Sequence, residues 1–312
     1  MSVFSRSDQR WVVERDGLTL RQVLDELNAP SEALADGRVF LDQRRMTLEQ
    51  QGQQLPLGSE VVVYRAREGA TVTILSEAHG VIAVHKPTGI STQPDHRGIG
   101  TSLLGELAQL LGEQPDALHA LHRLDREVSG VVLVSRNASA TAWVEKARDR
   151  GVFRRRYLAI ASGHMMQEAG SWNEPIGQGK RPGLRRVGGA NAKPALTRYQ
   201  RVAEVVARQV SLLVVEPATG RTHQIRVHAA HAKVPLLGDG DYGGQRRVVD
   251  VDGSVHALSR IALHAFQVSL PLLDGKDWNI QAPPPPDFVQ LWRSLGGGAE
   301  DLAALSDRAW LS

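Results

Sequence analysis

Cysteine is absent from this sequence of 312 residues. Its absence excludes disulfide bonds, thiolate zinc sites, iron–sulfur ligation and a cysteine nucleophile. Long apolar runs are missing as well, since no stretch approaches the roughly 18 uninterrupted apolar residues of a membrane-spanning helix. The first 17 residues also lack the apolar run of a signal peptide. We therefore expect a soluble, cytoplasmic protein that has no membrane partner.

Several common catalytic motifs are also missing. The sequence contains no Walker-type phosphate loop, no G-x-S-x-G and no H-E-x-x-H. Nucleotide hydrolysis and the common form of zinc hydrolysis therefore lose their usual sequence support. Histidines 228 and 231 would lie one turn apart on a helix and could hold a metal ion together with a carboxylate. That segment has no interleaved acid, however, and histidines on helices are more often hydrogen-bonded structural residues.

The net charge of the chain is small, but the charged residues are unevenly distributed along it. The 37 Lys and Arg residues against 34 Asp and Glu give a net charge of +3. Residues 1–67 hold 9 basic and 10 acidic side chains, so the positive charge belongs to the rest of the chain. It is concentrated in Gly177–Arg201, which contains no acid and predicts a flexible basic loop that suits a phosphate backbone. A merely solvated basic loop is the alternative interpretation.

The length and the patterning predict three parts. Residues 1–67 form a small unit, residues 71–292 a large domain and residues 293–312 a tail with a docked helix. In the small unit, Thr19 and Gln22 form a capping-box pattern before a helix, and a second helical piece begins at Ser31. Strands are expected at 39–41 and 61–64.

The large domain mixes strands and helices without strict alternation, which favours an α+β fold on a mixed, largely antiparallel sheet. The expected strands are 81–84, 131–134, 157–161, 196–202, 210–215 and 262–270. The expected helices are 102–111, 138–148 and 222–232.

The most informative stretch runs from His119 to Asn137. Asp125 lies between Arg123 and Arg126 in a turn region, just before a buried-looking strand. A carboxylate beside arginine stays ionised, because an opposite charge within a few ångström lowers its pKa. Such a carboxylate can act as a nucleophile or base. A structural Asp–Arg pair that closes a turn is the alternative, and spacing alone does not decide between them.

A family resemblance bears on this choice. HRLDREVSG at 122–130 resembles the H-R-L-D-x-x-T-S-G signature of RluA-type pseudouridine synthases. Further pieces follow in the family's order: HKPTGISTQP at 85–94, RRYLAIASG at 155–163, AKPALTRY at 192–199, GRTHQIRVH at 220–228, LLGDGDYGG at 236–244 and LHAFQVSLP at 263–271. The small unit is similar, more faintly, to the S-four-like α-L RNA-binding module. The resemblance implies a catalytic domain of pseudouridine-synthase fold behind a small domain of that module's type. Because this small unit carries more acid than base, RNA binding and a vestigial or partner-binding role are both open to it.

The resemblance also implies residue roles. Asp125 would be the catalytic aspartate, which exchanges the glycosidic carbon–nitrogen bond of uridine for a carbon–carbon bond. Arg226 would pair with Asp125 and keep it anionic. Tyr157 would pack against the uracil and assist proton removal from its ring carbon, while Ile225 supplies an apolar wall. Arg123 would replace the extruded nucleotide in the RNA stack, since a stacked base is out of reach of a carboxylate.

Three more residues complete the expected substrate-binding set: His122, Arg185 and Arg186. The family chemistry needs no metal or other cofactor, and we expect a monomer acting on structured ribosomal or transfer RNA. One departure is Val128, where the family has threonine. The alternative function is a non-catalytic RNA-binding or ribosome-assembly factor that has kept the fold.

Overall fold

The computed structural model describes residues 9–63, 72–94 and 102–305, apart from residues 28, 30–32, 35–38, 43, 47, 166, 182 and 304. The N-terminal residues form an antiparallel sheet in the order β1-β4-β2-β3 with one helix. Its elements are β1 (Gln9–Val12), α1 (Leu20–Glu26), β2 (Val39–Leu41), β3 (Arg44–Arg45) and β4 (Glu60–Val63).

The capping box predicted for the small unit is present. The Thr19 hydroxyl accepts from the Gln22 amide, and the Thr19 amide donates to the Gln22 side chain over 2.8 Å. The predicted strands at 39–41 and 61–63 are confirmed, whereas β1 and β3 were not predicted. The helical piece predicted from Ser31 falls largely outside the described residues, and so does Tyr64.

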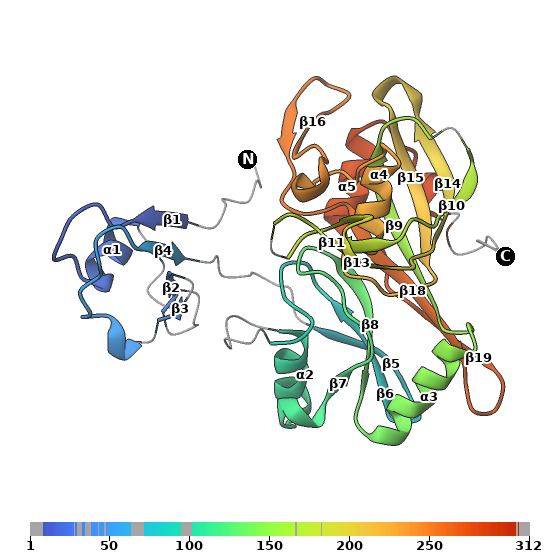
Figure 1. Cartoon of the computed structure of the whole chain (residues 1–312), viewed down its shortest axis with the longest axis horizontal. Helices are drawn as coiled ribbons and strands as arrows, with labels where there is room; N and C mark the ends of the chain where they lie inside the picture. Colours follow the sequence, from blue (N-terminus) through green and yellow to red (C-terminus); the bar gives the residue numbers. More distant parts are fainter. Residues whose placement is uncertain are drawn as a thin grey trace.

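The large unit is built on a mixed sheet whose main path is β10-β14-β15-β9-β18-β8-β6-β5, with β19 on β18 and β7 on β8 (Figure 1). Neighbouring strands are antiparallel except for the β8–β18 pair. This confirms the predicted α+β class. The strands are β5 (Thr73–Ala78), β6 (Val81–Lys86), β7 (His119–Ala120), β8 (Ser129–Ser135), β9 (Arg154–Ser162), β10 (Ala169–Trp172), β14 (Thr197–Val205), β15 (Val210–Pro217), β18 (Leu263–Pro271) and β19 (Asp277–Gln281).

Helices cover both faces of this sheet. Successive side chains of a strand point to opposite faces, so the all-apolar run in β8 supplies two cores. Val132 and Val134 pack in one core with α2 (Leu103–Leu111) and α4 (Gln224–His231). Val131 packs on the other face, which α3 (Ala138–Asp149) and α5 (Pro286–Ser294) cover. The continuous apolar run at 131–134 therefore forms a strand that is buried on both sides.

The parallel β8–β18 contact fixes where β8 begins. His264 pairs with Ser129, and Ala265 pairs with Gly130. Gly130 has φ +126°, and a Cβ at this position would lie 2.2 Å from the Ala265 carbonyl oxygen. Only glycine permits this approach. The close contact anchors the chain directly after the Asp125 loop.

The basic segment is not the flexible loop that its composition predicts. It folds as a three-stranded antiparallel sheet in the order β12-β11-β13, followed by the start of β14. Its strands are β11 (Ile176–Gln178), β12 (Arg185–Val187) and β13 (Ala190–Lys193). A Cβ at Gly177 would lie 2.3 Å from the Gly189 carbonyl oxygen, so the glycines allow close strand packing rather than mobility. Ile176 and Val187 also join a small apolar cluster with Val227 of α4.

The C-terminal residues continue the packing of the large unit. Helix α5 runs across the boundary predicted at residue 292, and α6 (Ala299–Ala303) follows. Trp292, Leu295 and Leu305 are buried in the same core, while Trp310 lies outside the described residues. A hairpin of β16 (Arg247–Val249) and β17 (Val255–Ala257) completes the elements. Within the described ranges, no helix has both the length and the apolar character needed to cross a membrane.

Candidate active site

Asp125 lies on the loop between β7 and β8, and this loop is held on both sides of the carboxylate. On one side, the Thr92 hydroxyl donates to the Leu124 carbonyl and accepts from the Leu124 amide, both at 3.0 Å. On the other side, the Gly89 amide donates to the Arg126 carbonyl at 2.6 Å, and the Arg126 Nε donates to the Gly89 carbonyl at 2.9 Å. The backbone on either side of Asp125 is therefore fixed by a segment far away in sequence.

A buried lysine shapes that holding segment. Lys86 is fully buried at the end of β6, and its ammonium donates to the carbonyls of Pro87 and Ile90 at 2.9 Å each. An ammonium group removed from water needs such partners. Lys86 thus closes the turn that carries Gly89 and Thr92 to the Asp125 loop.

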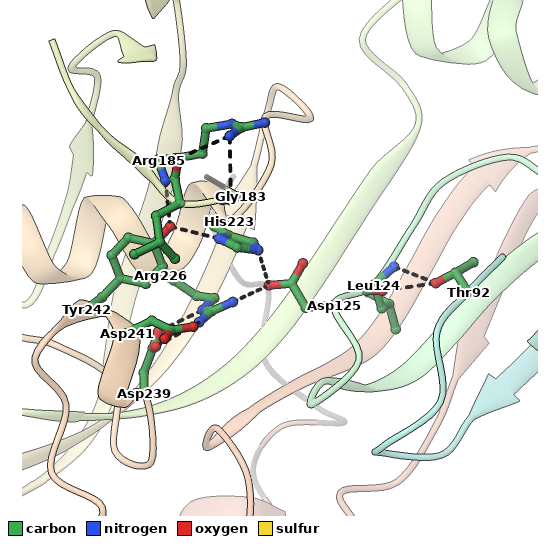
Figure 2. Close-up of polar contacts among 11 residues, drawn as sticks. Thr92, Leu124, Asp125, Gly183, Arg185, His223, Arg226, Asp239, Asp241 and Tyr242 are labelled. Carbon is green, nitrogen blue, oxygen red and sulfur yellow. Dashed lines mark hydrogen bonds and ion pairs between the residues drawn. The ribbon is translucent and has the colours of Figure 1, made fainter. Parts of the chain in front are cut away.

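Arg226 of α4 is the main partner of Asp125. Its Nη1 lies 2.9 Å from the Asp125 Oδ2, while Nε and Nη2 donate to the two oxygens of Asp239 at 2.8 Å each (Figure 2). Nη2 is also 3.2 Å from the Asp241 Oδ2. Burial alone lowers the pKa of Arg226, but the hydrogen bonds and charges of Asp239 and Asp125 outweigh it and raise that pKa. The guanidinium is therefore permanently cationic.

The three carboxylates around Arg226 differ in accessibility. The Asp239 side chain is 1% exposed, whereas that of Asp125 is 29% exposed. The two-pronged bond to Asp239 fixes the plane of the guanidinium. Asp125 is thus a substrate-accessible carboxylate held by an arginine that a second, buried carboxylate orients.

His223 and Tyr242 were not among the predicted site residues, yet His223 lies near Asp125 and Tyr242 contacts Arg226. His223 Nε2 lies 3.9 Å from the Asp125 Oδ2, and its Nδ1 lies 2.7 Å from the Tyr242 hydroxyl. The Tyr242 ring centre is 4.9 Å from the Arg226 guanidinium carbon, within the range of a cation–π contact. Burial lowers the pKa of His223, although the charge of Asp125 acts in the opposite direction. The helical spacing of His223 and Arg226 could have pointed to the histidine.

Tyr157 and Ile225 lie in the core beneath this group. Both are buried, on β9 and α4, in the core cluster of that face of the sheet. Burial raises the pKa of Tyr157, and the negative charge of Asp125 raises it further. The Tyr157 hydroxyl therefore stays protonated near neutral pH.

Arg123 and His122 have opposite placements. Arg123 is exposed, two residues before Asp125. His122 is buried, accepts a hydrogen bond from the Leu133 amide at Nε2 over 3.2 Å and packs on Phe153. Burial lowers the pKa of His122 well below its usual value. The structure does not bring His122 to the accessible carboxylate, because β8 holds its imidazole in the core.

Arg185 and Arg186 lie on β12, beside the site. Arg186 is exposed, and an open cavity of about 330 Å³ is lined by Gly179, Lys180, Arg181, Leu184, Arg185, Arg186, Gly240, Asp241 and Tyr242. Because Asp241 and Tyr242 also contact Arg226, this basic cavity adjoins the carboxylate site.

The remaining signature residues are packed inside. Val128 is 1% exposed, so the position where the family has threonine is a core position in this chain. Arg260 Nη1 donates to the Ser129 hydroxyl, which lies 2.8 Å from Nδ1 of His264. Burial lowers the pKa of His264 to about 3, so its imidazole is neutral. Ser129 therefore supports the start of β8 rather than facing the site.

The alternative of a metal site on α4 loses one of its two histidine ligands. His228 is fully buried, with Nδ1 2.8 Å from the Thr197 hydroxyl and Nε2 2.9 Å from the Glu174 carbonyl. Across the part of the chain that the structure describes, no three His, Asp or Glu side chains are grouped as metal ligands would be.

Residues 238–243 carry the letters G-x-G-x-x-G, the motif of a dinucleotide-binding loop. They form a 3₁₀ turn over Gly240–Tyr242 with no helix directly after it, unlike such a loop.

The chain is similar to known proteins over most of its length. Residues 80–231 match the family model described as RNA pseudouridylate synthase. An RNA pseudouridine synthase of Bacillus subtilis, YhcT, is 33% identical over 73% of each chain. Ribosomal large subunit pseudouridine synthase D of Vibrio vulnificus is 30% identical over 91% of this chain and 93% of its own. The solved structure of human RNA pseudouridylate synthase domain containing 4 superposes with a TM-score of 0.57 at 25% identity, over 71% of this chain and 92% of that one.

Proposed function

The chain belongs to the RNA pseudouridylate synthase family and is an RNA pseudouridine synthase, an isomerase, and from that premise we propose that Asp125 is its catalytic nucleophile. The observation that carries this assignment is the pairing of a partly exposed carboxylate with an arginine that a buried second carboxylate orients. A carboxylate held and oriented in this way can attack an electron-poor carbon.

The reaction needs no external oxidant, reductant or co-reactant. The bond between C1′ of the ribose and N1 of uracil breaks, and a bond between C1′ and C5 forms. C5 gives up its hydrogen and N1 gains one, so product and substrate are isomers. Asp125 would attack the sugar or ring carbon, and Arg226 would pair with the carboxylate and orient it.

Tyr157 and Ile225 would form the uracil pocket. Both side chains are buried in the same core cluster, and Tyr157 is near enough for the charge of Asp125 to affect its pKa. Since the Tyr157 hydroxyl stays protonated, it would assist proton removal from C5 through a hydrogen bond rather than as a phenolate. Its ring would stack on the base.

The target nucleotide must leave the RNA stack before it reaches Asp125. Extrusion costs a few kcal/mol, which stacking and phosphate contacts by the protein must offset. Arg123 is exposed two residues from Asp125, so its planar guanidinium is suited to fill the vacated position in the stack. Asp125, Arg226 and Tyr157 belong to one chain, and we propose that a monomer is active.

The basic cavity would bind the RNA backbone beside the target. We expect Arg185→Ala combined with Arg186→Ala to weaken RNA binding for all sequences and to reduce the slope of log affinity against log salt by about 1.5, since two phosphate contacts are lost. The rate at saturating RNA should change much less. Filter binding at several salt concentrations measures this, with the exposed Arg150→Ala on the opposite face as the control. An unchanged slope would mean that this sheet does not contact RNA.

We propose large-subunit ribosomal RNA as the substrate. A relative matched over 93% of its length is named for pseudouridine formation in that RNA. We expect cells that lack this gene to lose pseudouridine from large-subunit ribosomal RNA, as mapped across ribosomal and transfer RNA with and without the gene. Loss confined to transfer RNA would contradict the substrate, and an unchanged map would favour the non-catalytic RNA-binding or assembly factor.

A further inference from the structure

We propose that Tyr242 and His223 are positioning residues that connect the basic β11–β12–β13 sheet to Asp125. The inference rests on the proposed role of Asp125 and adds a route by which RNA bound to the sheet can act on that carboxylate. Three polar groups in series make up the route: the Arg185 backbone amide, the Tyr242 hydroxyl and the His223 imidazole (Figure 2).

The hydrogen-bond directions in this series follow from donor chemistry. The Arg185 amide can only donate, and it lies 3.0 Å from the Tyr242 oxygen. The tyrosine hydroxyl has one hydrogen, which is then available for His223 Nδ1 at 2.7 Å. A neutral imidazole that accepts at Nδ1 carries its proton at Nε2. Nε2 is the nitrogen that faces Asp125.

Both neighbours of Asp125 lie at the same oxygen of its carboxylate. Arg226 Nη1 lies 2.9 Å and His223 Nε2 3.9 Å from the same oxygen, Oδ2. Within the described residues, every polar contact of the Asp125 carboxylate is through Oδ2. Oδ1 is thereby left for the nucleotide. The 3.9 Å separation is longer than a hydrogen bond, and a movement of about 1 Å would bring the Nε2 hydrogen into bonding range.

The backbone at His223 is arranged for this contact. His223 has φ +56°, a left-handed conformation that is uncommon for a residue other than glycine. It stands at the start of α4, and its carbonyl accepts from the Val227 amide at 2.9 Å. The same helix carries Arg226, so both neighbours of the Asp125 Oδ2 are set by one element.

Tyr242 is the residue shared by the two regions. It lines the basic cavity together with Arg185 and Arg186, and its ring lies over the Arg226 guanidinium. A phosphate bound in the cavity would act on β12, whose Arg185 amide holds the tyrosine hydroxyl. Binding of the RNA backbone to the basic sheet can thus affect the Asp125 carboxylate through three successive contacts.

A double-variant cycle tests the connection. Tyr242→Phe removes the hydroxyl and keeps the ring, and His223→Asn keeps a residue that tolerates the left-handed conformation but is too short to reach Asp125. The RNA probe is total RNA from cells that lack the gene, incubated with increasing protein in single-turnover reactions. The observed rate is plotted against protein concentration. Its plateau value is the rate constant at saturation, and the protein concentration that gives half of this value is the apparent Kd.

We expect each variant to lower the rate constant about tenfold and to change the apparent Kd less than twofold. The double variant should be no slower than His223→Asn alone, because residues in series are not additive. Tyr199→Phe, a tyrosine stacked on Trp172 in the core, serves as the control. Thermal unfolding checks that every variant is folded. His223→Gly repeats the rate measurement with a residue that has no side chain.

Rate losses that multiply to about a hundredfold in the double variant would overturn the series arrangement. A rise in the apparent Kd with no fall in the rate constant would overturn it as well. Full activity of Tyr242→Phe would overturn the role of its hydroxyl. A failure of the proposed function has a different signature, because product from Asp125→Asn or none from the unaltered protein contradicts Asp125 catalysis.

Discussion

Replacing Asp125 by Asn is expected to lower pseudouridine formation by at least about a thousandfold, because the variant keeps the shape of the side chain but loses the anionic nucleophile. The Arg226 Nη1 can still donate to an amide oxygen. Asp239 and Asp241 continue to neutralise the guanidinium. The variant should therefore fold and bind RNA like the unaltered protein, and only the chemical step should fail.

The measurement is product formation under single-turnover conditions at saturating protein, with RNA binding followed in parallel. Asp116→Asn is the matched control, since Asp116 is an exposed aspartate in the turn before β7. A near-normal rate for Asp125→Asn would refute the nucleophile assignment. Equal RNA binding by both proteins with no product from either would support the non-catalytic alternative.

Replacing Arg226 by Leu is expected to abolish activity and also to destabilise the fold by about 3–5 kcal/mol. The reason is Asp239, whose side chain is 1% exposed and would be left as a buried charge without its partner. Arg226→Lys keeps the charge but cannot bind Asp239 with two parallel bonds while reaching Asp125. We therefore expect Arg226→Lys to be more stable than Arg226→Leu and still strongly impaired in activity.

Denaturant unfolding measures the stability, and a second substitution separates its two causes. Asp239→Asn in the Arg226→Leu background removes the unpaired charge, so part of the lost free energy of unfolding should return. Activity should not return, because Asp125 still lacks its partner. If Arg226→Leu unfolds at the same denaturant concentration as the unaltered protein, the buried Arg226–Asp239 pair does not stabilise the fold as we expect. Arg150→Leu is the exposed control.

Local patterning predicted many of the elements of this protein correctly. The Thr19–Gln22 capping box begins α1, and the apolar run at 131–134 is the centre of β8. These features depend on neighbours a few residues apart, and side-chain periodicity is a local property. The order of motifs along the chain also indicated the family, which the comparisons show. The division into three parts and an RNA-binding role of the small unit stay predictions.

Composition was a poor guide where long-range packing decides. Glycines and cations in 177–201 predicted a flexible loop, yet the segment is a small sheet, because its glycines allow close backbone contact and its apolar residues pack on α4. His122 belongs to the most specific motif, yet β8 buries it in the core. A residue's place in a motif does not state which way its side chain faces.

The sequence by itself determined the chemistry that is available: one carboxylate between two arginines, a third arginine in a helix, a tyrosine in a strand and no thiol. Only the tertiary structure decided which groups meet. Asp125 reaches Arg226, 101 residues further along the chain, because the sheet order brings α4 beside the loop before β8. Contacts between segments about a hundred residues apart depend on how strands pair and helices pack. Neither side-chain spacing nor net charge encodes that pairing locally.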